Sequence, residues 1–261
     1  MAKLKHFSYL KIKHFVIITT IGLVGSCKQS PQTLTDIAAK QIVVDSTYHS
    51  VEEISNFVKP YHDHVNSVLD STLAYAPHKI TKTDGEYNTS AGNLMADIVL
   101  LQASPVFKKR TGKDIDFVLL NHGGIRSVIS KGNVSARTAY EVMPFENTMA
   151  VASLKGSSIL DMVSYLIKSK RPHPVAGIQI VLNADNTLNS LKIQGKPFDK
   201  NKTYYVATSN YLITGGDNMG FFKDADEIIE IDYKIRNAMI DYFTKVDTIT
   251  AKVDDRYYKL D

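Results

Sequence analysis

The segment Asn121-His122-Gly123-Gly124-Ile125-Arg126 restricts the fold of this chain more than any other. It follows an apolar run from Ile115 to Leu120, whose length and composition are typical of a buried strand. The two glycines let the backbone turn where a side chain would clash. Arg126 comes directly after the turn, where a planar cation suits an anion or a polar small molecule. The pattern predicts a core strand that ends at a ligand-binding turn.

Two other segments carry groups of the kind that line a polar pocket. Thr214-Gly215-Gly216-Asp217 is a second glycine turn with a carboxylate, and Met143-Pro144-Phe145-Glu146-Asn147 lies between the two turns. Each residue alone has a plain structural explanation. Phe145 could fill the core, Asp217 could cap a turn, and Arg126 could pair with a surface acid. The joint occurrence of a cation, a carboxylate, an aromatic ring and carboxamides favours a single binding pocket.

The N-terminal segment predicts a secretory signal. Its head is basic, its apolar middle from Phe15 to Val24 is too short to span a bilayer comfortably, and small residues precede Cys27. This arrangement resembles a bacterial lipoprotein signal, in which Cys27 is lipidated and becomes the first mature residue. An ordinary signal peptide with an incidental cysteine is the alternative. We therefore expect a signal at 1–26, a lipidated tether at 27–40, and one domain at 41–261.

The lipid would anchor the protein to a membrane of the bacterial cell envelope, at the outer membrane or facing the periplasm. The charge balance gives no support to a nucleic-acid partner. The formal net charge is +4 and the sequence pI is 8.9. Four lysines and no acidic residue lie ahead of Cys27, and removing them from the 31 basic residues leaves 27, which match 27 acidic residues. The basic pI therefore belongs to the leader.

After the tether, helical and strand-like apolar patterns are mixed. Spacings of three and four from Val51 to Leu69 predict an amphipathic helix, which Pro60 should kink or restart. Further helices are expected at 91–109, 135–142, 156–168 and 233–245, and strands at 41–48, 73–80, 114–121, 148–154, 177–182, 188–194 and 203–208, with a last strand or tail at the C-terminus. Because several strands follow one another without helices between them, we expect an α+β fold rather than a doubly wound sheet.

Two of these helices have faces that should point inward. In the helix at 91–109 the predicted inward residues are Leu94, Ile98 and Leu101. In the helix at 156–168 they are Ile159, Met162, Val163 and Leu166. Ser135 is expected to cap the short helix that follows it.

Four segments resemble the C-terminal, substrate-binding domain of the 5′-nucleotidase/UDP-sugar hydrolase family. They are Ser90-Ala91-Gly92-Asn93-Leu94-Met95-Ala96-Asp97, Leu120-Asn121-His122-Gly123-Gly124-Ile125-Arg126, Met143-Pro144-Phe145-Glu146-Asn147-Thr148, and Asn210-Tyr211-Leu212-Ile213-Thr214-Gly215-Gly216-Asp217. Their order and spacing also fit, and the resemblance extends from about Tyr48 to Phe243. It implies a single α/β sandwich with mixed sheets flanked by helices.

The resemblance also implies a role for six residues. Phe145 and Tyr211 would stack on the two faces of a base, and Asp217 would accept hydrogen bonds from ribose hydroxyls. Arg126 would meet the phosphate side of the ligand, and Asn121 and Asn147 would offer amide donors and acceptors.

The sequence departs from the family pattern in three places. His122 stands where the family has the first glycine of its turn, and could either bond the ligand as a neutral imidazole or only fill space. Tyr211 replaces a common phenylalanine. No arginine precedes Gly92-Asn93, where family enzymes often grip phosphate; Lys79 and Lys82 are nearby, but each is a point charge without a bidentate fork.

The sequence carries no recognisable bond-cleaving apparatus. The phosphoesterase signatures Asp-x-His, Gly-Asn-His-Asp/Glu and Gly-His-x-His are absent, as are a Gly-x-Ser-x-Gly elbow and a phosphate-binding P-loop. His62-Asp63-His64 is the nearest approach to a metal cluster, and a solvated helix face explains it better. We therefore expect neither catalytic residues nor a metal or cofactor in this chain, and divalent metals only in a separate metallophosphoesterase chain.

The sequence thus predicts the nucleoside- or nucleotide-binding component of a split 5′-nucleotidase, in which the partner chain hydrolyses the phosphate ester. An envelope protein that scavenges nucleosides without a catalytic partner is an alternative. A degenerate scaffold that binds no nucleotide is another.

Overall fold

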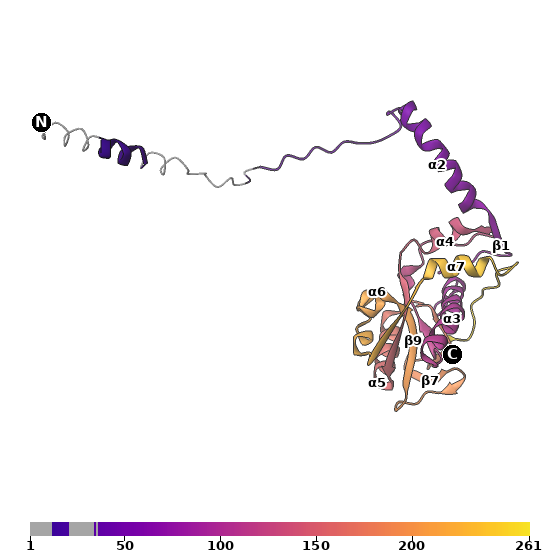
Figure 1. Cartoon of the computed structure of the whole chain (residues 1–261). Helices are drawn as coiled ribbons and strands as arrows, with labels where there is room; N and C mark the ends of the chain where they lie inside the picture. Colours follow the sequence, from indigo (N-terminus) through magenta and orange to yellow (C-terminus); the bar gives the residue numbers. More distant parts are fainter. Residues whose placement is uncertain (1–11, 21–33, 35) are drawn as a thin grey trace, which may run out of the picture. The chain divides into compact units, whose positions relative to one another are not determined.

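The computed structural model describes residues 12–20, 34 and 36–261 (Figure 1). The chain divides into two units, Met1–Glu52 and Glu53–Asp261, and the second holds nearly all of the regular structure found in the described residues. The predicted lipidation site Cys27 and the end of the predicted signal lie outside the described residues. No helix in the described residues is long and apolar enough to cross a bilayer.

A five-stranded mixed sheet forms the centre of the second unit. Its strand order is β10-β4-β9-β2-β5, and the strands are β10 (Glu227–Lys234), β4 (Thr148–Lys155), β9 (Thr203–Ser209), β2 (Phe117–Leu119) and β5 (Val175–Ala176). β2 and β9 run parallel, whereas the other neighbouring pairs are antiparallel. This sheet is the layer from which the candidate site is built.

The residues of β2 alternate between two hydrophobic cores. Phe117 and Leu119 pack into a core with α5 (Gly156–Ser169), whereas Val118 and Leu120 pack into a core with α3 (Ser90–Thr111) and α7 (Ile235–Phe243). Successive side chains of a strand point to opposite faces, so a strand buried on both faces reads as an unbroken apolar run. Figure 1 shows α3 and α7 on one side of β9 and α5 on the other.

Smaller elements extend this sandwich. A four-stranded sheet has the order β11-β6-β7-β8, from β11 (Tyr257–Lys259), β6 (Ile178–Leu182), β7 (Leu188–Ile193) and β8 (Lys196–Pro197). A two-stranded ribbon pairs β1 (Thr72–Ala76) with β3 (Gly132–Ser135), and α4 (Ala136–Val142) follows it. The remaining short helices are η1 (His122–Gly124), α6 (Asn210–Ile213), η2 (Gly216–Asn218) and η3 (Gly220–Asp224).

Local signals fix the ends of the helices. Thr89 caps α3 by accepting a hydrogen bond from the Gly92 N–H, and Gly112 ends the helix in the left-handed conformation. Ser135 is the N-cap of α4 and donates its N–H to the Thr138 hydroxyl.

Most of the predicted elements are confirmed, and the α+β class is confirmed with them. The four residues predicted to face inward on α5 are all buried. Two expectations are wrong, because residues 41–48 contain no strand and Leu101 is 58% exposed on α3. The helix α2 (Glu52–Asp70) contains Pro60 and continues past it, so of the two effects expected of this proline a restart does not occur. In addition, β10 was not foreseen as a strand.

Each of these errors has a physical reason. Residues 41–48 are exposed and pair with no strand in the described part of the chain, so their β-branched residues gain no cross-strand contact there. Leu101 follows the buried Ile98 by three residues, but it lies past the edge of the face that the core covers. Most of β10 is exposed on its edge of the sheet, which gives its sequence only a weak alternation.

Gly156 lies where β4 ends and α5 begins, and substituting it tests whether this connection needs close backbone packing. A Cβ atom there would lie 2.3 Å from the backbone carbonyl oxygen of Lys200, whereas a Cβ at Gly220 would meet nothing within 4 Å. We expect Gly156→Ala to lower the free energy of unfolding by about 1–3 kcal/mol. Gly220→Ala should change it by less than about 0.5 kcal/mol. Urea unfolding of both variants measures the free energy of unfolding, and equal values for the two would contradict the close packing of Gly156.

Candidate functional site

Three loops meet at one edge of the central sheet. β2 and β9 are parallel, so the turn after Leu119 and the segment after Ser209 leave from the same edge. β4 is antiparallel to β9 and pairs Met149 with Ser209, so the loop that enters β4 lies at that edge as well. Ligand sites commonly form outside the carboxyl ends of parallel strands. The three motifs that are far apart in the sequence are therefore brought together by strand pairing alone.

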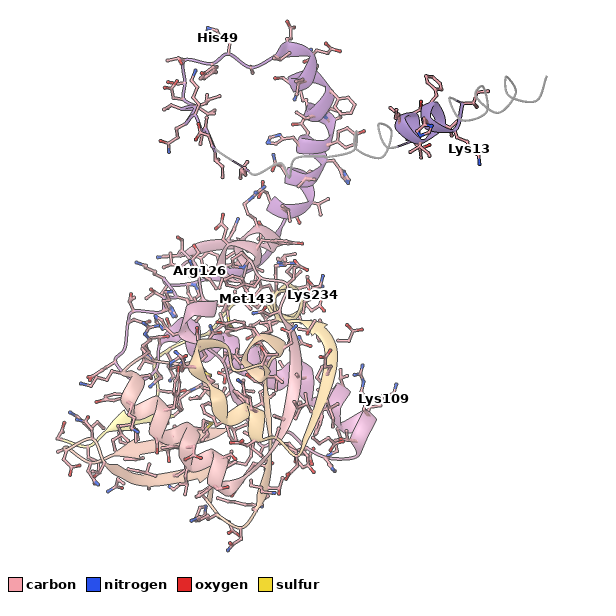
Figure 2. The ribbon with its side chains drawn as sticks, turned by 90° about the vertical axis from the view of Figure 1, so that its left-hand side faces the viewer. Lys13, His49, Lys109, Arg126, Met143 and Lys234 are labelled. Atoms are coloured by element: carbon pink, nitrogen blue, oxygen red, sulfur yellow. The ribbon has the colours of Figure 1, made fainter. Side chains whose placement is uncertain are left out.

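The six residues predicted to bind a ligand line one cavity. Its volume is about 310 Å³, and its walls are Asn121, Gly123, Gly124, Arg126, Phe145, Asn147, Tyr211 and Asp217. Phe145 is 40% exposed and Tyr211 43% exposed, so neither ring is sealed in the core. Arg126 and the buried Met143, which precedes Phe145, are labelled at this end of the domain in Figure 2. Small-molecule pockets in proteins usually begin at about this size.

Asp217 is held by hydrogen bonds on every side. The Asn121 amide donates to one carboxylate oxygen over 2.7 Å, and the Tyr211 hydroxyl donates to the other over 3.3 Å. The Asp217 N–H lies 3.2 Å from the same Tyr211 hydroxyl, and the Tyr165 hydroxyl donates to the Asp217 carbonyl. Asp217 has a φ of 52°, which is unusual for a residue with a side chain. The network fixes this strained residue and leaves its carboxylate oriented as an acceptor.

The second glycine turn is shaped by the ring of Tyr211. A Cβ atom at Gly216 would lie 2.5 Å from two carbons of that ring, and Gly215 has a φ of 91°. A side chain at Gly216 would therefore displace Tyr211 from the cavity wall.

Arg126 lines the cavity between the Phe145 ring and the first glycine turn. Its guanidinium carbon lies 6.0 Å from the centre of the Phe145 ring, and one Nη atom donates to the Gly123 carbonyl over 3.4 Å. No carboxylate in the described part of the chain forms an ion pair with it. Lys82 lies nearby, donating to the Ile125 carbonyl over 2.6 Å, and burial together with the Arg126 charge lowers the pKa of this lysine.

His122 does not line the cavity, although both its neighbours in the turn do. Burial is the main cause that lowers the pKa of its imidazole, and the charges of Lys82 and Arg171 add to it. The ring is therefore neutral near pH 7.

His173 is a residue that the sequence did not reveal. It lies between two prolines in a loop, and the residue is only 2% exposed behind the first glycine turn. The His122 N–H donates to its Nδ1 over 3.2 Å, so the ring must be neutral with its proton on Nε2. Burial lowers the pKa of His173 to about 4. No periodic signal in the sequence distinguishes this histidine from a surface one.

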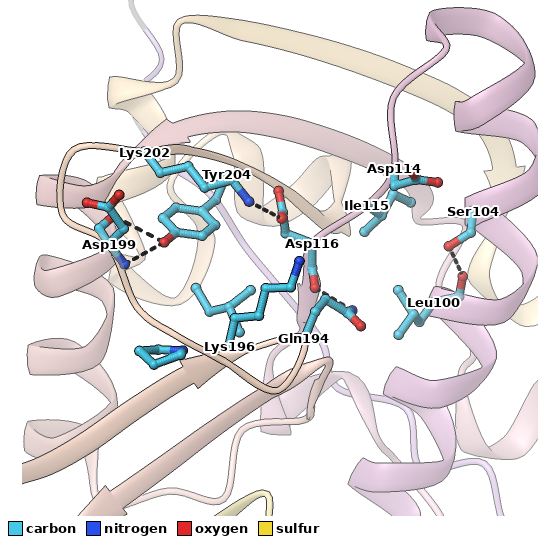
Figure 3. Close-up of a pocket in the computed structure, with 12 residues that line it drawn as sticks. Leu100, Ser104, Asp114, Ile115, Asp116, Gln194, Lys196, Asp199, Lys202 and Tyr204 are labelled. Atoms are coloured by element: carbon cyan, nitrogen blue, oxygen red, sulfur yellow. Dashed lines mark hydrogen bonds and ion pairs between the residues drawn. The ribbon is translucent and has the colours of Figure 1, made fainter.

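A larger cavity of about 660 Å³ lies elsewhere, between α3 and the β7–β8 hairpin (Figure 3). The Asp116 carboxylate in it accepts from Lys202 over 2.9 Å and from the Tyr205 N–H over 2.8 Å. The Gln194 amide donates to the Asp116 carbonyl. These bonds tie β9 and the β7–β8 turn to the start of β2, which is a structural task. None of the six predicted residues lies there.

Metal ligands do not gather in the described residues. No group of three or more His, Cys, Asp or Glu side chains in them could hold an ion. His62, Asp63 and His64 lie exposed on α2.

A family model for the 5′-nucleotidase C-terminal domain matches residues 72–224, which is more than half of the chain. The chain belongs to this family. The family resemblance predicted from the four motifs is thereby confirmed. The matched segment contains both glycine turns and the loop between them.

The relatives are considerably longer than this chain. Protein UshA of Escherichia coli is 36% identical over 111 residues, which are 41% of this chain and 20% of UshA. The trifunctional nucleotide phosphoesterase protein YfkN of Bacillus subtilis is 32% identical over 164 residues, which are 56% of this chain and 11% of YfkN. The 5′-nucleotidase precursor of Thermus thermophilus shares the fold with a TM-score of 0.66 at 23% identity, over 80% of this chain and 42% of that one. The chain thus spans less than half the length of each of these relatives.

The neutral state of His173 leads to a prediction about how the stability of the protein depends on pH. Its folded pKa of about 4 is below the unfolded value of about 6.5, so the unfolded chain gains a proton first as the pH falls. Stability is therefore complete above pH 6.5 and should decrease by about 3 kcal/mol as the pH falls to 4. His173→Asn keeps an acceptor for the His122 N–H but cannot be protonated, and should remove this part of the pH dependence. Urea unfolding at several pH values measures it.

His64→Asn on the exposed face of α2 is the matched control and should leave the pH profile unchanged. The account of His173 is wrong if the wild type and His173→Asn lose stability in parallel over this range.

Proposed function

We propose that this protein is the nucleoside- or nucleotide-binding component of a split 5′-nucleotidase. The observation that carries the proposal is the single cavity lined by Asn121, Arg126, Phe145, Asn147, Tyr211 and Asp217. Membership of the 5′-nucleotidase C-terminal domain family supports the same class of ligand. In this proposal the chain recognises the ligand and a separate metallophosphoesterase chain hydrolyses the phosphate ester.

The cavity has the groups that a nucleoside needs. Phe145 and Tyr211 present aromatic faces for a base, and stacking on such faces accepts any base. Asp217 uses one acceptor position on each carboxylate oxygen for Asn121 and Tyr211, so further lone pairs remain for ribose hydroxyls. Arg126 would meet a phosphate group at the mouth of the cavity, and Asn147 would bond the base or sugar. His122 acts in this proposal through the shape of its turn.

The helix α2 supports the presence of a protein partner. Its apolar stripe is exposed along the whole helix and consists of Ile54, Phe57, Val58, Tyr61, Val65 and Val68. The helix is joined to the rest of the unit by Arg137, which bonds Asp70 and Asn66. Such a stripe on a helix normally covers another surface.

The partner of α2 should be a protein rather than an anionic membrane. The helix carries four acidic residues and one lysine, and this charge opposes an anionic lipid surface. It also enters the matched domain directly, since the family match begins at residue 72, two residues after the helix ends. The longer relatives have additional chain beyond the matched region. We therefore propose that the metallophosphoesterase chain docks on the apolar stripe.

We further propose that the protein is held at the bacterial cell envelope by lipid on Cys27. The basic head, the short apolar segment and the small residues before this single cysteine support the proposal. An anchor of this kind would keep the binding domain outside the cytoplasm, where nucleotides from the surroundings arrive.

Calorimetry with adenosine tests the pocket. Phe145→Ala and Tyr211→Ala should each weaken binding by about 1–3 kcal/mol, because each removes one stacking face. Tyr211→Phe is the matched control, since it keeps the ring and loses only the hydroxyl that holds Asp217. It should retain the affinity for free adenine but lose affinity for adenosine. Unchanged affinity in both alanine variants would place the ligand elsewhere, and no binding at millimolar adenosine would favour the scaffold alternative.

Purification from the native envelope tests whether a separate phosphoesterase chain binds this protein and carries out the hydrolysis. The complex should contain a metallophosphoesterase and release phosphate from adenosine monophosphate with Mn²⁺, whereas the isolated chain should release none above a metal-free control. Phe57→Glu in the apolar stripe should abolish co-purification, and Lys59→Gln on the polar face should not. Both variants should still bind adenosine.

Two results would contradict this part of the proposal. Phosphate release by the isolated chain would show that it is itself catalytic. A preparation that binds adenosine but contains no phosphoesterase would favour the scavenging protein.

A further inference from the structure

A basic pocket lies at the C-terminal end of α5, away from the six residues of the candidate nucleoside site. Its volume is about 400 Å³, and it is enclosed by α5, the β6–β7 turn, β11 and the segment that precedes α3. Four cations line it, namely Lys168, Lys170, Arg171 and Lys259. Glu86 is the one acidic residue among its lining residues. We call this set of residues the basic pocket.

These four cations share one pocket, whereas other exposed lysines without an ion pair in the described part of the chain, such as Lys196 and Lys245, do not line it. Lys155, Lys202 and Lys234 each pair with a carboxylate. None of the four cations of the basic pocket forms an ion pair with any residue that the structure describes. Four cations and the single carboxylate of Glu86 leave the basic pocket with an excess of positive charge, which favours an anionic ligand.

Helix geometry accounts for only part of the cluster. Lys168 is in the last turn of α5, and Lys170 and Arg171 follow it directly, so the carbonyl end of the helix dipole offsets some of their repulsion. Lys259 comes from β11, near the C-terminus of the chain, so its presence in the pocket does not follow from the sequence at the end of α5. The fold brings it to the other three through the pairing of β11 with β6, in which Lys259 lies opposite Leu182.

The floor of the basic pocket consists of packed apolar and aromatic side chains. Leu166, Leu182 and Tyr257 are buried beneath it, and the Tyr87 ring packs on the Tyr257 ring with centroids 5.1 Å apart. A concave, firmly supported surface of this volume suits a small ligand, whereas a membrane or a nucleic acid would need a wide, even surface. Lysine and arginine side chains that converge on a concavity are typical of phosphate recognition.

We propose that the basic pocket is a second ligand site, which binds a small polyanion of the polyphosphate class. The shared chemistry is a chain of phosphate groups, either free or as the tail of a nucleotide. The site is separate from the nucleoside cavity, because the two have no lining residue in common. The inference does not require the proposed function to be correct.

Arg171 connects the basic pocket electrostatically to the first glycine turn. After burial, its charge is one of the influences that lower the pKa of His122 and of His173. A polyanion bound beside Arg171 would cancel this influence, and the pKa of His122 should rise. Binding of an anion in the basic pocket can therefore be detected as a rise in the pKa of His122, although His122 does not line that pocket.

Titration with inorganic tripolyphosphate at constant ionic strength tests the proposal. Calorimetry should show saturable binding, and the His122 resonances in an NMR pH titration should move to a higher midpoint when the anion is present. The double variant Arg171→Gln/Lys259→Gln should bind at least about tenfold more weakly, since two charged contacts are lost. These side chains are exposed, so both substitutions should leave the fold intact.

The matched control removes two exposed lysines that do not line the basic pocket. Lys196→Gln/Lys245→Gln has the same change of net charge and should bind tripolyphosphate within about twofold of the wild type at the same ionic strength. Equal weakening in the two double variants would mean diffuse attraction to a cationic surface. That result, or the absence of binding at millimolar tripolyphosphate, would overturn the proposal.

A second ligand separates the two sources of phosphate and the two sites. Adenosine triphosphate should still bind to the Phe145→Ala variant through the basic pocket if its phosphate tail is recognised there. If only free tripolyphosphate binds, the ligand is an inorganic polyphosphate. A failure of adenosine to bind the wild type would count against the nucleoside cavity and leave the tripolyphosphate result unaffected.

Discussion

The parallel pairing of β2 with β9 is the constraint on which the candidate site depends. It sets Phe117 opposite Val206 and Val118 opposite Ala207, so both strands send their following loops over the same edge. The antiparallel β4 adds the loop that carries Phe145 and Asn147. A slip of one residue in β2 would exchange its two faces and move Phe117 and Leu119 into the wrong core. The register that builds the core therefore also builds the cavity.

Within that frame, hydrogen bonds turn a group of loops into an organised site. Asp217 is fixed through its carboxylate, its N–H and its carbonyl by Asn121, Tyr211 and Tyr165. His173 supports the other turn from beneath, and it can accept the His122 N–H only while it is neutral. Organisation of this kind lowers the ordering cost of binding, because the acceptor and the ring already have their places before a ligand arrives.

The sequence predicts those parts of the structure that local patterns determine. The strand before Asn121 is an unbroken apolar run, and the inward face of α5 repeats at three and four, so both were predicted correctly. The family motifs identified the six cavity residues, which the structure brings together although they come from segments up to 96 positions apart. Their recognition role stays a prediction until a ligand is measured.

The remainder could not be predicted because it depends on partners that the sequence does not reveal. Residues 41–48 have strand-like composition but pair with no strand that the structure describes, and Leu101 lies beyond the covered face of α3. The burial of His173 and the approach of Lys259 to α5 arise from contacts between distant segments. Charge and periodicity in one sequence cannot show which exposed-looking residues such contacts will bury or gather.

A crystal structure of the protein soaked with adenosine tests the central claim most directly. The account predicts that the adenine ring lies between Phe145 and Tyr211, with a ribose hydroxyl within hydrogen-bonding distance of the Asp217 carboxylate. Adenosine bound in another cavity, or an empty cavity at a saturating concentration of adenosine, would contradict it.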